Sequence, residues 1–165
     1  MSRFSFRPQV EALDGRCLPS GNPTISIGDA IVTEGDSGQT ALVFHVTLSK
    51  PTSKEVSVSF ATQDGTATTA GNDYEAASGT LKFAPGETDK TITVLVNGDT
   101  TYEGPVYAPW GPAFEAFYVN LNGAGKGVKI ADAQGSCVIS DDDPNPYYYE
   151  LPPDDNVSYP GFGGE

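Results

Sequence analysis

The middle of the chain alternates apolar and other residues with a period of two, which is the pattern of a half-buried β-strand. In the stretch 40–48, Leu42, Phe44, Val46 and Leu48 fall on one face. The same alternation predicts six further strands at these ranges: 24–27 continued by 30–32, 55–62, 79–83, 90–96, 115–121 and 135–140. Gly, Pro, Asn and Asp, the usual turn residues, separate the runs.

Seven strands with one apolar face each must bury those faces against one another. The economical solution is an antiparallel sandwich of two sheets, and no segment carries an apolar stripe of helical period. The chain has 165 residues, enough for one ordinary domain. We therefore expect one all-β domain over residues 24–143.

The segments on either side of this domain lack periodicity. Residues 1–23 form an N-terminal arm whose stretch 6–20 resembles a short motif of exported and surface proteins of some bacteria, which implies a secreted or cell-surface protein. A disordered leader without such a role is the alternative. Residues 144–165 are rich in Pro, Tyr and Gly and predict a disordered tail. No apolar run approaches the length of a membrane-spanning helix.

The composition is acidic, with a formal net charge of −13. That balance argues against a nucleic-acid partner, because phosphate binding requires clustered Lys and Arg. It is compatible with cation binding or with solubility alone. The two cysteines, Cys17 and Cys137, lie far apart and form no disulfide framework or Cys-x-x-Cys motif. Cys137 lies in a strand pattern and is interpreted as a small core residue.

Three adjacent aspartates, Asp141 to Asp143, follow the last predicted strand, and Pro144 comes directly after them. Adjacent carboxylates repel one another unless a cation lies among them. A run of this kind is by itself typical of a solvated acidic cap on a strand end. Whether it has another role depends on the acids that the fold brings to the same place.

Strand direction brings further acids to the end at which the last strand exits. Successive antiparallel strands alternate direction, so three of the connections share that end, while several lysines fall at the other. Eight acids there could surround one ion cluster: Glu34, Asp73, Asp99, Glu103, Glu115, Asp141, Asp142 and Asp143. Oxygen ligands without Cys or His suit Ca²⁺, which accepts six to eight oxygens, better than zinc or copper.

Several motifs of the domain resemble those of the Calx-beta family, a module of sodium–calcium exchangers and of many bacterial surface proteins. The resemblance covers nearly all of residues 25–143. The motifs that carry it are Val32-Thr33-Glu34-Gly35, Asp64-Gly65-Thr66-Ala67, Gly71-Asn72-Asp73-Tyr74, the stretch 78–88, Asp99 to Glu103, the stretch 117–121 and the stretch 138–143.

The resemblance implies an immunoglobulin-like antiparallel sandwich of about seven strands with Greek-key topology, whose end loops can bind calcium. It implies ligands at Glu34, Asp73, Asp99, Glu103 and the run Asp141, Asp142 and Asp143. This chain departs from the family pattern in two places. Asn97-Gly98 stands where the family often has acids, and the insertion 104–113 displaces Glu115, the natural equivalent of a further acid. We therefore expect fewer ions than in an exchanger domain.

The insertion 104–113 also contains Trp110, the only tryptophan. An exposed aromatic loop could contact a glycan or a protein partner. The alternative is that Trp110 packs over the edge of the sandwich.

Three function classes follow from these observations. The first is a non-catalytic calcium-binding module of an exported or surface protein. The second is a structural or adhesive spacer that binds no ion. The third is an enzyme, which the sequence disfavours: the only histidine, His45, falls on the outer face of its strand, and no catalytic triad or phosphate-binding glycine loop is present.

Overall fold

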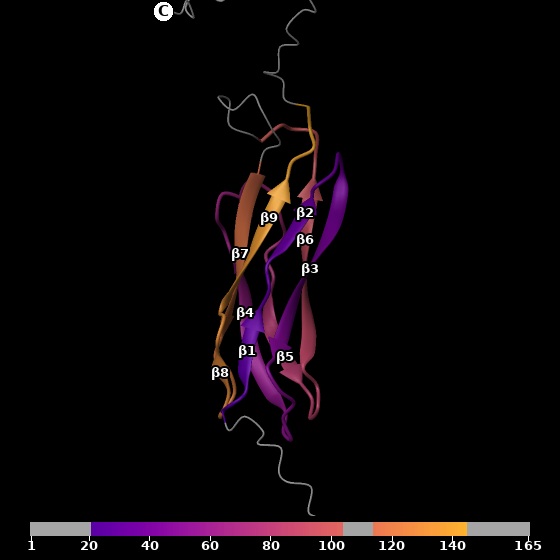
Figure 1. Ribbon diagram of the computed structural model, residues 1–165. Coiled ribbons are helices and arrows are strands. Elements are labelled where there is room, and N and C mark those ends of the chain that lie inside the picture. Colours follow the sequence, from indigo (N-terminus) through magenta and orange to yellow (C-terminus); the bar gives the residue numbers. More distant parts are fainter. Residues whose placement is uncertain (1–20, 104–113, 145–165) are drawn as a thin grey trace, which may run out of the picture.

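The protein is a sandwich of two β-sheets in a computed structural model that describes residues 21–103 and 114–144 (Figure 1). The strands of these described residues are β1 (Thr24–Ile27), β2 (Ala30–Thr33), β3 (Gly38–Leu48), β4 (Val56–Gln63), β5 (Ser78–Phe83), β6 (Asp89–Gly98), β7 (Phe114–Asn122), β8 (Lys129–Ile130) and β9 (Gln134–Ser140). Residues 1–20 of the N-terminal arm, Trp110 with its insertion, and the tail after Pro144 lie outside the described residues.

One sheet has four strands in the order β6-β3-β1-β8, and the other has five in the order β2-β9-β7-β4-β5. The chain changes sheet between every pair of successive strands except β4 and β5, so neighbours in a sheet are often distant in sequence. This confirms the predicted immunoglobulin-like two-sheet sandwich. The domain is elongated, and β9 runs toward the end opposite to the one at which the described chain begins (Figure 1).

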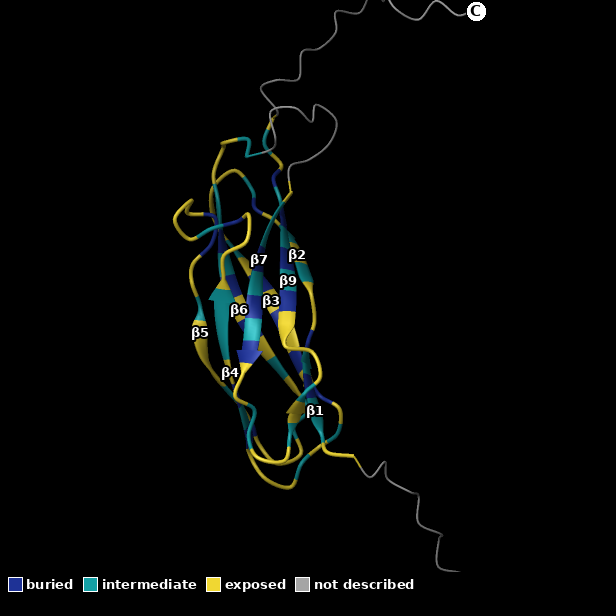
Figure 2. Ribbon diagram, turned by 90° about the vertical axis from the view of Figure 1, so that its left-hand side faces the viewer, coloured by how far each residue is buried: buried dark blue, intermediate teal, exposed yellow. Residues whose placement is uncertain are grey.

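The core lies between the sheets and consists of the residues that the alternation placed on the inner faces. Leu42, Phe44, Val46 and Leu48 of β3 are all at most 4% exposed. Residues of β1, β4, β5, β6, β7 and β9, together with Ala67 and Tyr74 of the loop between β4 and β5, complete the same cluster. The buried positions run along the middle of the strands (Figure 2). Phe44 meets Phe117 edge-on with ring centroids 6.3 Å apart, so the two sheets interlock through aromatic rings.

The first predicted strand is in fact two strands in different sheets. β1 pairs antiparallel with β3, whereas β2 pairs parallel with β9. The change occurs at Gly28 and Asp29: Gly28 N–H still donates to His45 O at 3.0 Å, and the Asp29 carboxylate accepts from Ser136 N at 2.8 Å. A single apolar run in the sequence therefore contributes strands to both sheets, because only two residues connect β1 to β2. The short β8, parallel to β1, was not predicted.

Two single-residue predictions are confirmed by the packing. His45 lies on the outer face of β3 with 65% of its side chain exposed, and its ring lies 3.4 Å from the Asp89 carboxylate. Cys137 is fully buried and free, and burial raises the pKa of its thiol to about 12. In the part of the chain that is described, no helix has the length and apolarity needed to cross a membrane.

Two valines of β3 test this division between inner and outer faces. Val46 is fully buried, whereas Val43 is 44% exposed. Val46→Ala is expected to lower the free energy of unfolding by about 2–3 kcal/mol, because it removes two buried methyl groups and leaves a cavity. The matched control Val43→Ala is expected to cost less than about 1 kcal/mol. Urea unfolding measures both, and equal losses would contradict the assignment of faces.

Candidate metal centre

Two groups of carboxylates lie at the end of the sandwich where β9 exits. The first carboxylate group consists of Glu34, Asp141 and Asp143, and the second consists of Asp73, Glu103 and Glu115. Within each group, one oxygen from every residue lies within 4.8 Å of the others. Charges this close repel one another strongly in a desolvated place, so the fold itself must hold them together.

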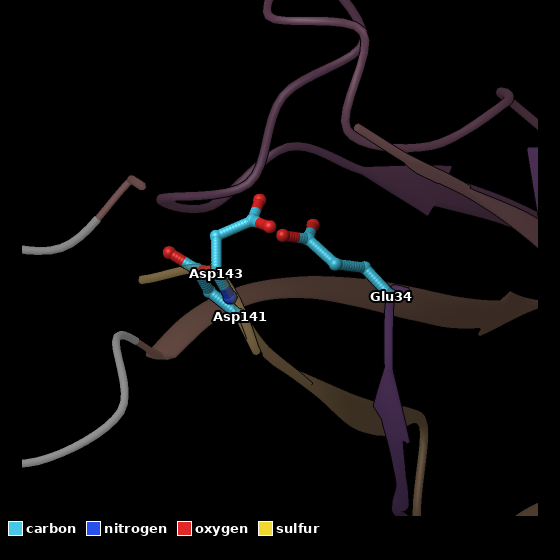
Figure 3. Close-up of side chains that lie close together, drawn as sticks. All are labelled: Glu34, Asp141 and Asp143. Carbon is cyan, nitrogen blue, oxygen red and sulfur yellow. The ribbon is translucent and has the colours of Figure 1, made fainter. Parts of the chain in front are cut away.

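The parallel pairing of β2 with β9 builds the first carboxylate group. Glu34 directly follows β2, and its N–H donates to Ser140 O at 3.2 Å, which sets it beside Asp141. Asp143 N–H then donates to Asp141 Oδ1 at 2.7 Å, so the chain turns back after β9. The carboxylates of Glu34 and Asp143 point toward one another as a result (Figure 3).

The second carboxylate group is drawn from two connections and one strand. Asp73 lies in the loop between β4 and β5, and this loop is tied to β6 because Asn97 N–H donates to Asp73 O at 2.9 Å. Glu103 follows β6, and Glu115 is the second residue of β7. Glu103 N–H donates to Asp141 Oδ2 at 2.8 Å, which joins the two groups directly.

Several oxygens of these groups are cut off from water. Glu34, Asp141 and Asp73 are 4%, 4% and 8% exposed. Glu34 Oε1, Glu115 Oε2 and Asp143 Oδ2 are buried without a hydrogen-bond partner among the described residues. A buried acceptor that lacks a donor costs free energy, and more so when it is charged. A cation among these oxygens would remove that cost.

The protonation of the groups reflects the same crowding. For four of these acids burial is the largest cause of a raised pKa, and neighbouring carboxylates add to it: Glu34, Glu103, Glu115 and Asp143. The pKa of Glu34 is raised to about 8, by burial first and then by Glu103 and Asp141. The pKa of Glu115 is raised to about 7, by burial and then by Asp73 and Glu103. The ligand types, all carboxylate oxygen, suit a hard divalent cation.

The structure gathers six of the eight predicted ligands, including Glu115 despite the insertion before it. The other two, Asp99 and Asp142, lie nearby in exposed turns. Asp142 Oδ1 accepts from Gly35 N at 3.0 Å, and Asp99 Oδ1 accepts from Thr101 N at 2.6 Å. The Asp99 charge still raises the pKa of Glu34. That any of the eight binds an ion stays a prediction.

Asn97 and Gly98, which stand in place of acids, serve a structural role that sequence reasoning missed. Asn97 Nδ2 donates to Asn72 O at 2.7 Å, beside Asp73. Gly98 packs so closely that an added Cβ would lie 2.0 Å from Gly35 O, next to Glu34. Each residue therefore fixes the backbone of one carboxylate group. Gly98 is visible in the sequence, but its close contact with Gly35, in the loop between β2 and β3, is not.

Comparison with known proteins identifies relatives of the whole domain. The model of one family, the Calx-beta domain, matches residues 24–143. Sodium/calcium exchanger 2 of Rattus norvegicus and of Homo sapiens is 37% identical over 78 residues, which is 47% of this chain and 7% of the exchanger. Sodium/calcium exchanger 1 of Bos taurus is 52% identical over 48 residues, 29% of this chain and 5% of the exchanger. The matches thus span a small part of these relatives.

Solved structures show the same fold. The apo form of the Calx CBD1 domain is similar with a TM-score of 0.61 and 28% identity, over 74% of this chain and 99% of that one. The calcium binding domain CBD12 of CALX1.1 gives a TM-score of 0.59 and 30% identity, over 72% of this chain and 46% of that one. The Calx CBD2 domain, at 17% identity and a TM-score of 0.56, shares the fold.

The raised pKa values predict how the stability of the calcium-free protein depends on pH. Glu34 and Glu115 bind a proton more tightly in the folded than in the unfolded protein. The stability that they contribute is complete below about pH 4.5 and is lost as pH rises through about 7 and 8. The melting temperature in calcium-free buffer is therefore expected to fall by several degrees between pH 5 and pH 8.5.

The substitution Glu34→Gln isolates one contribution to this pH dependence. Glutamine keeps the size of the side chain and carries no charge, so the fall in melting temperature should be smaller than in the wild type. Glu55→Gln is the matched control, because Glu55 is exposed at the other end. A wild-type melting temperature that rises over this pH range would contradict the raised pKa values.

Proposed function

Because the chain belongs to the Calx-beta domain family, we propose that its domain is a non-catalytic module that binds Ca²⁺ at the two carboxylate groups. The observation that carries the proposal is the set of three buried carboxylate oxygens without a partner among the described residues, on Glu34, Glu115 and Asp143. The alternative is that the acidic end serves only solubility. That role does not require any of the acids to be buried.

The donor set supports calcium over other metals. Three carboxylates in each group offer up to six oxygens, and calcium accepts six to eight oxygens in flexible geometry, with water or backbone completing the shell. Magnesium demands stricter octahedral geometry and keeps more of its water. We propose one ion in each group and an affinity on the order of 10⁻⁴–10⁻³ M, as in extracellular modules.

Similarity to known calcium-related proteins supports the same proposal. The relatives named above are exchangers of sodium and calcium, and one solved structure at 30% identity is described as a calcium binding domain. Bound calcium would neutralise the crowded negative charge. It would also hold together the segments that follow β2, β6 and β9, which carry carboxylates of both groups. The module would then be stiff at the end that leads to the C-terminal tail.

We also propose that the protein is exported or displayed at a cell surface, on the basis of the N-terminal stretch 6–20. The described chain begins at one end of the sandwich and β9 runs to the other (Figure 1), which is the arrangement of a spacer that continues a chain along one axis. A spacer role is compatible with calcium binding. A spacer without an ion is the alternative that a calcium titration excludes or supports.

Thermal melting with calcium and with a chelator tests the proposal. A ligand that binds only the folded state stabilises it by about 2.7 kcal/mol at a hundredfold excess over Kd. We expect a higher melting temperature in calcium at pH 7.5, a rise of several degrees. Titration calorimetry should show heat with calcium and much less with magnesium. Equal melting temperatures in calcium and in chelator would refute calcium binding.

Substitution of a single aspartate tests whether the effect of calcium depends on the proposed site or only on the overall negative charge. Asp143→Asn removes the charge of a residue whose Oδ2 has no partner among the described residues, and the shift caused by calcium is expected to shrink by at least half. Asp89→Asn is the matched control, because Asp89 begins β6 at the opposite end and pairs with His45 at the surface. A variant of Asp143 that keeps the full shift would show that the first carboxylate group is not the site.

A further inference from the structure

The turn that follows β4, residues 64–69, contacts the backbone beside Glu115. Thr66 Oγ1 accepts from Ala116 N at 2.8 Å, and Ala67 N–H donates to Ala116 O at 3.0 Å. Pairing between β4 and β7 ends at Gln63 and Tyr118, so at Ala116 this turn takes the place of β4. Glu115 is therefore held by β9 on one side and by the 64–69 turn close to its other side.

The contact of this turn with β7 is close enough to require glycine. A Cβ added at Gly65 would lie 2.3 Å from Ala116 O and 3.1 Å from the Tyr118 ring. Such an approach cannot accommodate a side chain without moving one backbone away from the other. The spacing between the turn and β7 is thus fixed by Gly65 as well as by the hydrogen bonds of Thr66.

The same turn also holds Asp73. Thr68 N–H donates to Asp73 Oδ2 at 2.6 Å, which fixes the orientation of that carboxylate and leaves Oδ1 for another partner. One short segment therefore contacts Asp73 itself and Ala116, the residue that follows Glu115. A displacement of the turn would move Asp73 and Glu115 relative to each other.

Asp64 closes the turn and anchors it to the core. Its Oδ1 accepts from Thr69 N at 3.1 Å and from the Tyr74 hydroxyl at 2.6 Å. Tyr74 is 3% exposed and its ring stacks on Phe117 with centroids 4.0 Å apart. The Tyr74 hydrogen bond is the main reason that the pKa of Asp64 is lowered, whereas the pKa values of Glu103 and Glu115 are raised. Asp64 thus serves as a hydrogen-bond acceptor.

We propose that Asp64, Thr66 and Tyr74 are positioning residues for calcium binding at the second carboxylate group. They touch no ion, but they set the separation and orientation of the carboxylates of Asp73 and Glu115. Calcium selects oxygens at 2.3–2.6 Å, so a small change in that separation weakens binding. This inference rests on the proposed function, and it assigns a role to the motif Asp64-Gly65-Thr66-Ala67, whose acid joins neither carboxylate group.

Thr66→Val tests the proposal with little change in shape, since Thr66 is exposed and only its hydroxyl is lost. Thr66→Ser keeps the hydroxyl that accepts from Ala116 N and should therefore bind calcium as the wild type does. Thr52→Val is the matched control, because the Thr52 hydroxyl donates one hydrogen bond, to Lys54 O at 2.7 Å, far from the site. Tyr74→Phe removes the hydroxyl that anchors Asp64 and is a second, independent variant.

Calcium titration calorimetry on the full chain gives the first measurement. Kd for the ion at the second carboxylate group is expected to rise about fivefold in Thr66→Val and in Tyr74→Phe, the equivalent of one ordinary hydrogen bond. It should stay within about twofold of the wild type in Thr66→Ser and Thr52→Val. Unchanged affinity in Thr66→Val, with stability lowered as in Thr52→Val, would overturn the positioning role and leave a purely structural one.

Crystal structures of the calcium-free wild type and of Thr66→Val give a measurement that does not depend on binding. The carboxylates of Asp73 and Glu115 are expected to lie farther apart in the variant, with the first carboxylate group unchanged. Carboxylates in identical positions would overturn the inference. If the wild type itself shows no heat with calcium, the proposed function fails, and this comparison still decides whether the turn positions the two acids.

Discussion

The mutual repulsion of carboxylates at one end of the sandwich is the constraint on which the site depends. Glu34, Glu103 and Glu115 all have raised pKa values because they are removed from water and placed near other acids. The fold offsets part of this cost with backbone N–H donors, such as those of Glu103 and Asp143 to Asp141. The oxygens that remain without a donor among the described residues are those that a cation would satisfy. Stability and the proposed ion binding therefore depend on the same set of side chains.

Strand pairing supplies the rigidity that this arrangement requires. The change of sheet at Gly28 and Asp29 lets β2 run parallel to β9, which brings Glu34 beside Asp141 over a sequence separation of more than 100 residues. The loop after β4 is fixed by its own hydrogen bonds, with Asp64 as the acceptor at its centre. Both groups therefore rest on elements that the buried core holds in place, because the strands that carry them also contribute Phe117 and Ile139 to that core.

The sequence alone predicted the inner faces of the strands well, since alternation reports burial directly. Leu42, Phe44, Phe117 and Ile139 are buried as expected. Strand direction also predicted which acids share an end of the sandwich, because successive antiparallel strands alternate direction and their order along the chain is read from the sequence. The sequence could not indicate that the first run of apolar residues divides between two sheets, since both halves have the same period. It gave no sign that Asn97 would bind the backbone beside Asp73, because that contact depends on strands distant in sequence.

The sequence by itself determined the all-β class, the residues of the core and the chemical kind of the site, because periodicity and residue type are local properties. Tertiary structure decided how the acids divide into two groups, which oxygens are buried without a partner, and which acids serve instead as acceptors. Asp64 and Asp142 have the same side chain as Asp143, yet Oδ1 of each meets an N–H or O–H donor, whereas Asp143 Oδ2 is buried without a partner among the described residues. The difference arises from the backbone and side-chain donors that pack against each carboxylate, and only the assembled fold brings those donors near.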